Sequence, residues 1–128
     1  MAFDPVAYLN EPRWQKVSLE LSRIRRLMEL LEHPEARLRC VHVAGTNGKG
    51  STCACLDAIC RSAGLKTGLF TSPYLMRFEE RIRVDGEDIP LDDLRACTLK
   101  VRRAAERVQH ETGEHPTEFE LMFTVAAL

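Results

Sequence analysis

The sequence lacks the features of an exported, membrane-spanning or zinc-binding protein. It contains no run of about 18 apolar residues, and residues 1–5 do not have the basic and then apolar order of an export signal. The five cysteines are odd in number and form no C-x-x-C pair, so they predict neither a disulfide framework nor a zinc site. We therefore expect a cytoplasmic protein without a membrane segment, whose thiols are reduced and buried.

A large excess of charge of one sign is also absent, because 18 basic and 19 acidic side chains leave a net charge of -1. Binding to nucleic acid or to anionic membranes depends on clustered positive charge, so neither partner is expected. With 128 residues and a hydrophobic fraction of 45%, the chain is long enough for one domain with a hydrophobic core.

Two apolar patterns precede the most informative segment. Apolar residues at helical spacing predict a helix over residues 18–32, capped by Ser18 and ended at His33. Residues 38–43 form a short apolar run between two turns, which fits a buried strand better than a helix. His42 lies in this strand, where we expect a hydrogen-bonded core histidine rather than a ligand.

The following segment combines glycines, one lysine and hydroxyl side chains at the start of a predicted helix. Glycines allow consecutive backbone N–H groups to point at one anion, and the helix N-terminus adds its positive end. The lysine supplies a mobile charge for the outer phosphates. We therefore predict an ATP-binding loop made of Gly45, Thr46, Asn47, Gly48, Lys49, Gly50, Ser51 and Thr52.

A strand, this loop, a helix and a second strand follow one another along the chain. The helix is expected over residues 50–63, apolar nearly all round and packed against a sheet, and the second strand over residues 66–71. This order forms a β-α-β unit with a parallel sheet, in which ligands bind at the carboxyl ends of the strands. The predicted fold class is therefore α/β, a P-loop-containing parallel sheet flanked by helices, with Ser72 beside the loop.

The rest of the chain predicts a hairpin and two helices. Residues 81–89 alternate polar and apolar side chains around an Asp-Gly pair, which is typical of a hairpin. Helical spacing predicts a helix with one buried stripe over residues 91–110. Residues 117–128 are strongly apolar and also fit a helix. We expect residues 121–128 to face solvent and to promote self-association through this segment.

The loop departs from the common G-x-x-x-x-G-K-[ST] pattern, because Val43 occupies the first glycine position and Gly50 separates Lys49 from the hydroxyls. In this form it resembles the ATP loop of the folylpolyglutamate synthase and dihydrofolate synthase family, within the Mur ligase superfamily. Further segments resemble family motifs in order and spacing; they are Leu21-Ser22-Arg23-Ile24, Thr71-Ser72-Pro73-Tyr74-Leu75, Phe78-Glu79-Glu80-Arg81-Ile82 and Pro116-Thr117-Glu118-Phe119-Glu120. Two positions depart from these motifs: Glu20 replaces a glycine that precedes the first one, and Tyr74 replaces a histidine in the second.

The resemblance implies a truncated Mur-ligase-like ATPase domain, with residues 1–128 as a partial N-terminal ATP-binding domain that lacks the glutamate-ligase domain. It also implies an ATP-dependent ligase that joins glutamate to a folate or dihydropteroate carboxylate through an acyl phosphate. Phosphorylation is needed because a free carboxylate would have to expel oxide when an amine attacks it. By itself the chain is expected to bind nucleotide weakly and to be inactive as a ligase.

By the same resemblance, Lys49 and Glu120 are the candidate catalytic residues, and Ser72 and Glu120 are the candidate ligands of Mg²⁺ at the γ-phosphate. Mg²⁺ keeps several waters and takes one or two protein groups, often a carboxylate and a hydroxyl. Considered alone, Ser72 also fits a turn or cap residue, and Glu120 a solvated carboxylate at a helix start. Glu118 is the competing carboxylate, but the family places its glutamate after the aromatic residue, so Glu120 is preferred.

The candidate substrate-binding residues are Ser22, Arg23, Tyr74 and Arg81. The resemblance suggests pterin contacts for Ser22 and Arg23, and a tyrosine can stack on a flat pterin. For Arg81 the alternative is the solvated face of the hairpin, which it would share with Arg83.

Two other functions fit part of this pattern. The first is a stand-alone nucleotide-binding or regulatory module without ligase activity, which would give Ser72 and Glu120 no reason to match a magnesium site. The second is a small P-loop kinase, but nothing in the sequence supplies lid arginines or an acceptor pocket. The ligase is therefore the favoured hypothesis.

Overall fold

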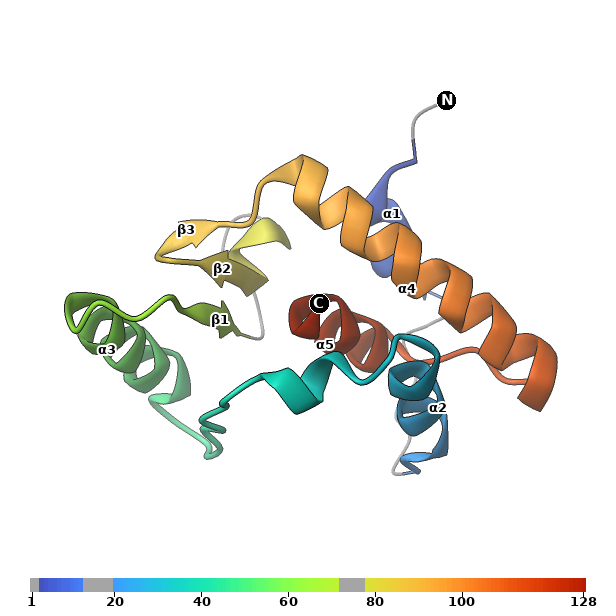
Figure 1. Ribbon diagram of the computed structural model, residues 1–128, viewed down its shortest axis with the longest axis horizontal. Coiled ribbons are helices and arrows are strands. Elements are labelled where there is room, and N and C mark those ends of the chain that lie inside the picture. Colours follow the sequence, from blue (N-terminus) through green and yellow to red (C-terminus); the bar gives the residue numbers. More distant parts are fainter. Residues whose placement is uncertain (1–2, 13–19, 72–77) are drawn as a thin grey trace. The chain divides into compact units, whose positions relative to one another are not determined.

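Residues from both ends of the sequence form one structural unit, and the residues between them form another. The computed structural model describes residues 3–12, 20–71 and 78–128. The helical unit comprises Met1–Leu38 and Asp92–Leu128, and the loop-sheet unit comprises Arg39–Leu91. Each unit has its own secondary structure (Figure 1).

Among its described residues, the helical unit contains four α-helices and the short 3-10 helix η2 at Pro34–Arg37. The α-helices are α1 (Pro5–Leu9), α2 (Ser22–Leu30), α4 (Leu91–Thr112) and α5 (Glu118–Ala127). Helices α1 and α2 both pack against α5. Fully buried side chains from all four α-helices form the core, among them Leu9, Leu27, Leu94, Val101, Val108, Leu121 and Met122.

Local signals determine where α2 and α5 begin or end. Helix α2 is shorter than predicted and ends before two left-handed residues, Glu32 (φ 64°) and His33 (φ 54°). The predicted cap Ser18 lies outside the described residues. Helix α5 begins with a capping box, in which Thr117 and Glu120 satisfy each other's backbone N–H groups.

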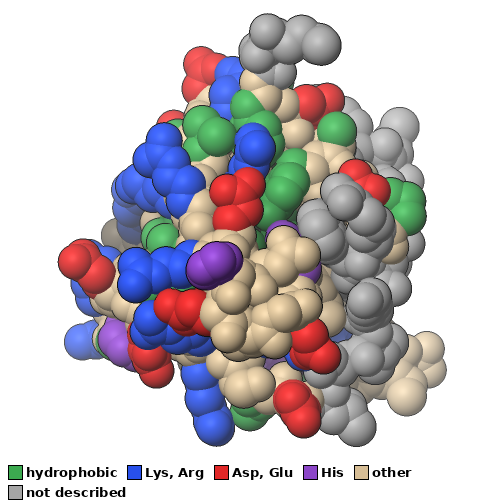
Figure 2. All heavy atoms as spheres, turned by 90° about the vertical axis from the view of Figure 1, so that its right-hand side faces the viewer, with side chains coloured by type: hydrophobic (Ala, Val, Ile, Leu, Met, Phe, Trp, Pro, Cys, Tyr) green, Lys and Arg blue, Asp and Glu red, His purple; other side chains and the backbone are tan. Residues whose placement is uncertain are grey.

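Ion pairs join the helices at the surface of the helical unit. Arg26 of α2 donates to Glu111 of α4 (Nε to Oε2, 2.9 Å), and Arg107 donates to the same carboxylate (3.3 Å). The hydrogen bond from Arg26, with a smaller contribution from Arg107, lowers the pKa of Glu111 to about 2. Figure 2 shows basic and acidic side chains lying beside one another over one face of the molecule. This mixed charge agrees with the small net charge of the sequence.

Among its described residues, the loop-sheet unit contains α3 (Lys49–Ser62), the 3-10 helix η3 (Phe78–Arg81) and three short strands. The strands are β1 (Gly68–Phe70), β2 (Ile82–Val84) and β3 (Glu87–Asp88), in the sheet order β1-β2-β3. Both strand pairs are antiparallel, with Leu69 opposite Arg83 and Arg83 opposite Asp88. Helix α3 packs against β1.

The predicted hairpin is confirmed. Its two turn residues, Asp85 (φ 51°) and Gly86 (φ 84°), adopt the left-handed conformation that a two-residue turn between β2 and β3 requires. A side chain at Gly86 would also come within 2.5 Å of the Arg61 guanidinium. Asp85 Oδ1 accepts from the N–H of Thr67 at 2.8 Å, which connects the hairpin to the segment before β1.

The expected parallel sheet is not found among the described residues, where every strand pair is antiparallel. Residues 38–43 form no strand, and Leu38 and Val41 are 48% and 78% exposed. A parallel strand is buried only when neighbouring strands and helices cover it, and the described residues do not cover this segment. The predicted core position of His42 is likewise wrong, because this histidine is exposed.

Other burial predictions also need correction. The apolar residues of α3 were expected to pack on a sheet, but only Asp57 of this helix is buried, and Leu56 and Ile59 are exposed. The cysteines are free but not buried: Cys40 and Cys55 are exposed and the others are intermediate.

The apolar C-terminal segment also differs from its prediction. Leu121, Met122 and Val125 are at most 2% exposed, because they face the core of the helical unit. Only Phe123 and Leu128 keep large exposed fractions there, 41% and 40%. The exposed apolar surface on which the predicted self-association depends is therefore limited to one side of α5. Within the described ranges, no helix combines the length and apolarity that crossing a bilayer needs.

Candidate nucleotide-binding site

The predicted phosphate loop is a bend that leads directly into α3. Residues 45–48 form the bend, and Gly48 is the N-cap of the helix with φ 73° and no side-chain cap. Gly45 also has a positive φ, 149°. These conformations favour glycine. The first-turn N–H groups of α3 therefore have no capping side chain on Gly48 to occupy them, which suits an anion ligand.

Lys49 is the first residue of α3 and is exposed. A Cβ atom placed on Gly45 would lie 4.0 Å from Lys49 Cγ, so the stem of the lysine runs close to the first glycine of the loop. Lysine and loop backbone are thus neighbours. The remaining loop residues are also exposed, in the bend or in the first turn of α3; they are Thr46, Asn47, Gly50, Ser51 and Thr52.

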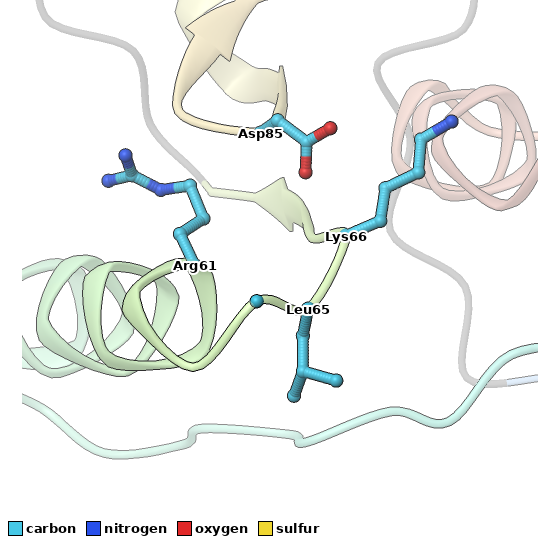
Figure 3. Close-up of a pocket in the computed structure, with 5 residues that line it drawn as sticks. Arg61, Leu65, Lys66 and Asp85 are labelled. Atoms are coloured by element: carbon cyan, nitrogen blue, oxygen red, sulfur yellow. The ribbon is translucent and has the colours of Figure 1, made fainter.

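An open surface pocket of the loop-sheet unit lies at the other end of α3. It has a volume of about 480 Å³ and is lined by Arg61, Gly64, Leu65, Lys66 and Asp85 (Figure 3). Helix α3 has 14 residues, so its two ends are about 21 Å apart. The pocket is therefore separate from the phosphate loop and is not the predicted nucleotide site.

Glu120 lies in the first turn of α5 and is not a solvated carboxylate, because its side chain is only 12% exposed. Its Oε1 atom accepts from the N–H of Thr117 at 3.0 Å and from Arg23 Nε at 3.2 Å. Its Oε2 atom is buried and has no hydrogen-bond partner within the described part of the chain. One oxygen of this carboxylate is thus held by the protein, and the other has no hydrogen-bond partner among the described residues.

Arg23 is brought to Glu120 from the first turn of α2. It is 7% exposed, and its Nη1 donates to Glu114 Oε2 at 2.6 Å. Burial lowers the pKa of Arg23, but the hydrogen bonds and negative charges of Glu120 and Glu114 outweigh this effect and raise it above its ordinary value. Arg23 is therefore a buried cation shared by two carboxylates.

Of the four other predicted site residues, the structure describes two. Ser22 is the exposed first residue of α2. Arg81 is 6% exposed, and its guanidinium carbon is 6.0 Å from the centre of the Phe70 ring, so it does not lie on a solvated hairpin face. Ser72 and Tyr74 lie outside the described residues.

Lys49 and Glu120 belong to different units, the loop-sheet unit and the helical unit. Within the described ranges, no group of three or more His, Cys, Asp or Glu side chains is arranged to hold a metal ion. A Mg²⁺ ion that uses one carboxylate, one hydroxyl and waters would not form such a group.

Known proteins resemble this chain over most of its length. The dihydrofolate synthase/folylpolyglutamate synthase of Bacillus subtilis (strain 168) is 43% identical over 108 residues, which is 84% of this chain and 25% of that protein. The folylpolyglutamate synthase of Lacticaseibacillus casei is 40% identical over 121 residues, 93% of this chain and 28% of that protein. The chain belongs to the folylpolyglutamate synthase and dihydrofolate synthase family.

Solved structures of this family share the fold of the chain. The folylpolyglutamate synthetase from Lactobacillus casei aligns with a TM-score of 0.88 and 38% identity, over 96% of this chain and 31% of that one. A complex of the family with AMPPCP and folate aligns with a TM-score of 0.87 and 37% identity, over 96% of this chain and 30% of that one. No protein-family model matches the chain. The chain spans between a quarter and a third of the length of these relatives.

Two features of this family member were missed from its sequence. The first is the capping box, although Thr117 followed three positions later by Glu120 is its usual signature. The second is the ion pair between Arg23 and Glu120. Its signal was a charged residue four positions before Leu27, on the buried stripe of a helix, where a cation requires a partner.

Proposed function

We propose that this chain is the ATP-binding part of a ligase that joins glutamate to a folate or dihydropteroate carboxylate through an acyl phosphate. The observation that carries the proposal is the alignment of 96% of the chain with a family complex that contains AMPPCP and folate. On this proposal, residues 1–128 are a partial N-terminal ATP-binding domain, which binds nucleotide but does not complete the ligation alone.

The loop supplies the nucleotide contacts. The backbone N–H groups of residues 45–48 and of the first turn of α3 would hold phosphate oxygens, because a helix N-terminus carries partial positive charge. Lys49, whose stem runs beside Gly45, would place its ammonium group on the outer phosphates. There it would stabilise the negative charge that develops while the γ-phosphoryl group passes to the carboxylate.

Glu120 fits the requirements of a ligand for the magnesium ion that accompanies ATP. Its Oε2 atom is buried without a hydrogen-bond partner in the described residues, and a buried carboxylate oxygen without a partner is costly unless a cation binds there. We infer that Glu120 and the Ser72 hydroxyl hold this ion. When bound, Mg²⁺ would neutralise charge on the γ-phosphate.

Three residues would contact the substrate. Tyr74 would stack on or hydrogen-bond the pterin, and Ser22 and Arg81 would lie near the substrate. The buried position of Arg81 over Phe70 suits a residue that shapes a site rather than one on a solvated hairpin. Arg23 is held by two carboxylates, which favours a role inside the protein over direct pterin contact.

Calorimetric titration with MgATP tests the proposed nucleotide site. We expect Lys49→Ala to abolish measurable binding, and Glu120→Gln to retain binding but to weaken its dependence on Mg²⁺. Lys66→Ala is the matched control, because it removes an exposed lysine at the other end of α3. Equal ATP affinity in the wild-type chain and in Lys49→Ala would contradict the proposal.

A ligation assay distinguishes a ligase from a nucleotide-binding or regulatory module, since both would bind nucleotide through this loop. Binding of MgATP with glutamate ligation by a longer chain that contains these residues supports the ligase. Binding of MgATP without ligation by such a chain supports a nucleotide-binding or regulatory module instead.

A further inference from the structure

Arg23 is a charged residue in an unusual place. It is only 7% exposed and lies in the first turn of α2, one helical turn before the fully buried Leu27. A buried cation is unfavourable unless its hydrogen bonds are satisfied by negative groups. Its two partners are Glu120 (Nε to Oε1, 3.2 Å) and Glu114 (Nη1 to Oε2, 2.6 Å).

These contacts make the two oxygens of Glu120 unequal. Oε1 accepts from both Arg23 Nε and the Thr117 N–H group. Oε2 is buried and accepts from no group among the residues that the structure describes. With Oε1 occupied, the carboxylate presents a single oxygen in a fixed direction.

The charge of the cluster also suits a cation. Arg23 lies between two carboxylates, so its positive charge neutralises only part of their negative charge. Glu114 is 67% exposed in its side chain, whereas Glu120 is 12% exposed. Glu114 thus satisfies the second donor of the guanidinium from the solvent side, and the buried oxygen of Glu120 keeps its negative character.

We propose that Arg23 is a positioning residue, which holds Glu120 through Oε1 so that Oε2 alone faces the divalent cation bound with ATP. This inference rests on the proposed function, because it takes Glu120 as the metal ligand. Groups that hold a metal ligand in place commonly change metal affinity by 10- to 100-fold when removed. Arginine suits the task because its planar guanidinium presents several donors in a rigid arrangement, which lysine cannot do.

The test measures metal affinity apart from ligase activity. Mn²⁺ is titrated into the chain with AMPPCP, and free Mn²⁺ is followed by electron paramagnetic resonance. We expect Arg23→Gln to weaken Mn²⁺ binding about 10-fold, and metal-free binding of AMPPCP to stay at the wild-type level. Arg23→Lys keeps the positive charge but not the planar set of donors, so we expect an intermediate loss of Mn²⁺ affinity. This variant should remain folded and serves as the test if Arg23→Gln fails to fold.

Arg26→Gln is the matched control. Arg26 is on the same helix and joins it to α4 through Glu111, so its loss removes an ion pair between helices without touching Glu120. We expect Arg26→Gln to bind Mn²⁺ like the wild-type chain.

Three outcomes are distinguishable. Wild-type Mn²⁺ affinity in a folded Arg23→Gln or Arg23→Lys variant, with only a lower melting temperature, would overturn the inference and leave the proposed function standing. Wild-type Mn²⁺ affinity in Glu120→Gln would reject Glu120 as the ligand and the inference with it. A wild-type chain that fails to bind AMPPCP with Mn²⁺ would overturn the proposed function itself.

Discussion

Gly48 and Gly50 are two positions apart but have opposite conformational requirements. Gly48 has φ 73°, whereas Gly50 lies inside α3 and has open space around its Cα atom. We expect Gly48→Ala to lower the free energy of unfolding by about 1 kcal/mol, because a side chain is strained at positive φ. Gly50→Ala, in the first turn of α3, is the matched control and should not lower this free energy, because alanine is a better helix former than glycine. Urea unfolding measures both, and equal effects of the two substitutions would contradict this account.

Individual residues also show how far the site could be read from the sequence. The loop of residues 45–52 was readable because its glycines, lysine and hydroxyls are consecutive, and their spacing carries the chemistry. The pairing of Arg23 with Glu120 was not readable, because these residues are 97 positions apart and only the packing of α2 on α5 brings them together. A single charged residue on a buried stripe shows that a partner is needed but not which one.

At the scale of the helix, α5 depends on its first turn. The Thr117 hydroxyl accepts from the Glu120 N–H group at 3.2 Å, and Thr117 is the N-cap of the helix. We expect Thr117→Ala to lower the free energy of unfolding by about 1 kcal/mol, the usual effect of losing an N-cap. Ser62→Ala, at the exposed last residue of α3, is the control and should change it by less than about 0.5 kcal/mol. Thermal unfolding that shows the same stability for both variants would argue against the cap.

The link between α2 and α4 should depend on pH. The pKa of Glu111 is lowered to about 2 by the hydrogen bond from Arg26. A carboxyl group with a lowered folded-state pKa stabilises the protein above its ordinary pKa of 4.5, and this stabilisation is lost as pH falls towards about 2. The urea midpoint of the wild-type chain should therefore fall more than that of Arg26→Gln between about pH 5 and about pH 3. High salt should reduce the difference, because the pair is near the surface. Parallel acid dependence of the two chains would disprove the linkage.

Elements with a local sequence signal were predicted well, but the strands and helices against which elements pack were not. The hairpin of β2 and β3, helix α4 and helix α5 follow from turn residues and apolar spacing that lie within each segment. The predicted parallel sheet is not found among the described residues, because pairing between residues 38–43 and another strand depends on neighbours that no local pattern specifies. The exposure of α3 has the same origin. The apolar residues of a helix indicate that another element should pack on it, but they do not indicate which element.

For the whole molecule, the two units differ in how much apolar surface they bury. Helices α4 and α5 contribute several fully buried side chains to the helical unit, whereas α3 in the loop-sheet unit buries only Asp57. Amide hydrogen exchange slows where opening exposes buried apolar contacts. We expect the central amides of α4 and α5 to exchange at least about 10-fold more slowly than those of α3. Mass spectrometry of exchanged peptides measures this, and uniform protection across both units would contradict the difference.

The division of the helical unit between Met1–Leu38 and Asp92–Leu128 affects the order in which the protein can fold during synthesis. Helix α2 leaves the ribosome long before α5 exists, so Leu27 and Met28 stay uncovered on the nascent chain until the last part of this sequence has been translated. The consecutive residues Arg39–Leu91 need no such wait. We therefore expect α2, the helix that carries Arg23, to be the element most prone to aggregation before α5 has been synthesised.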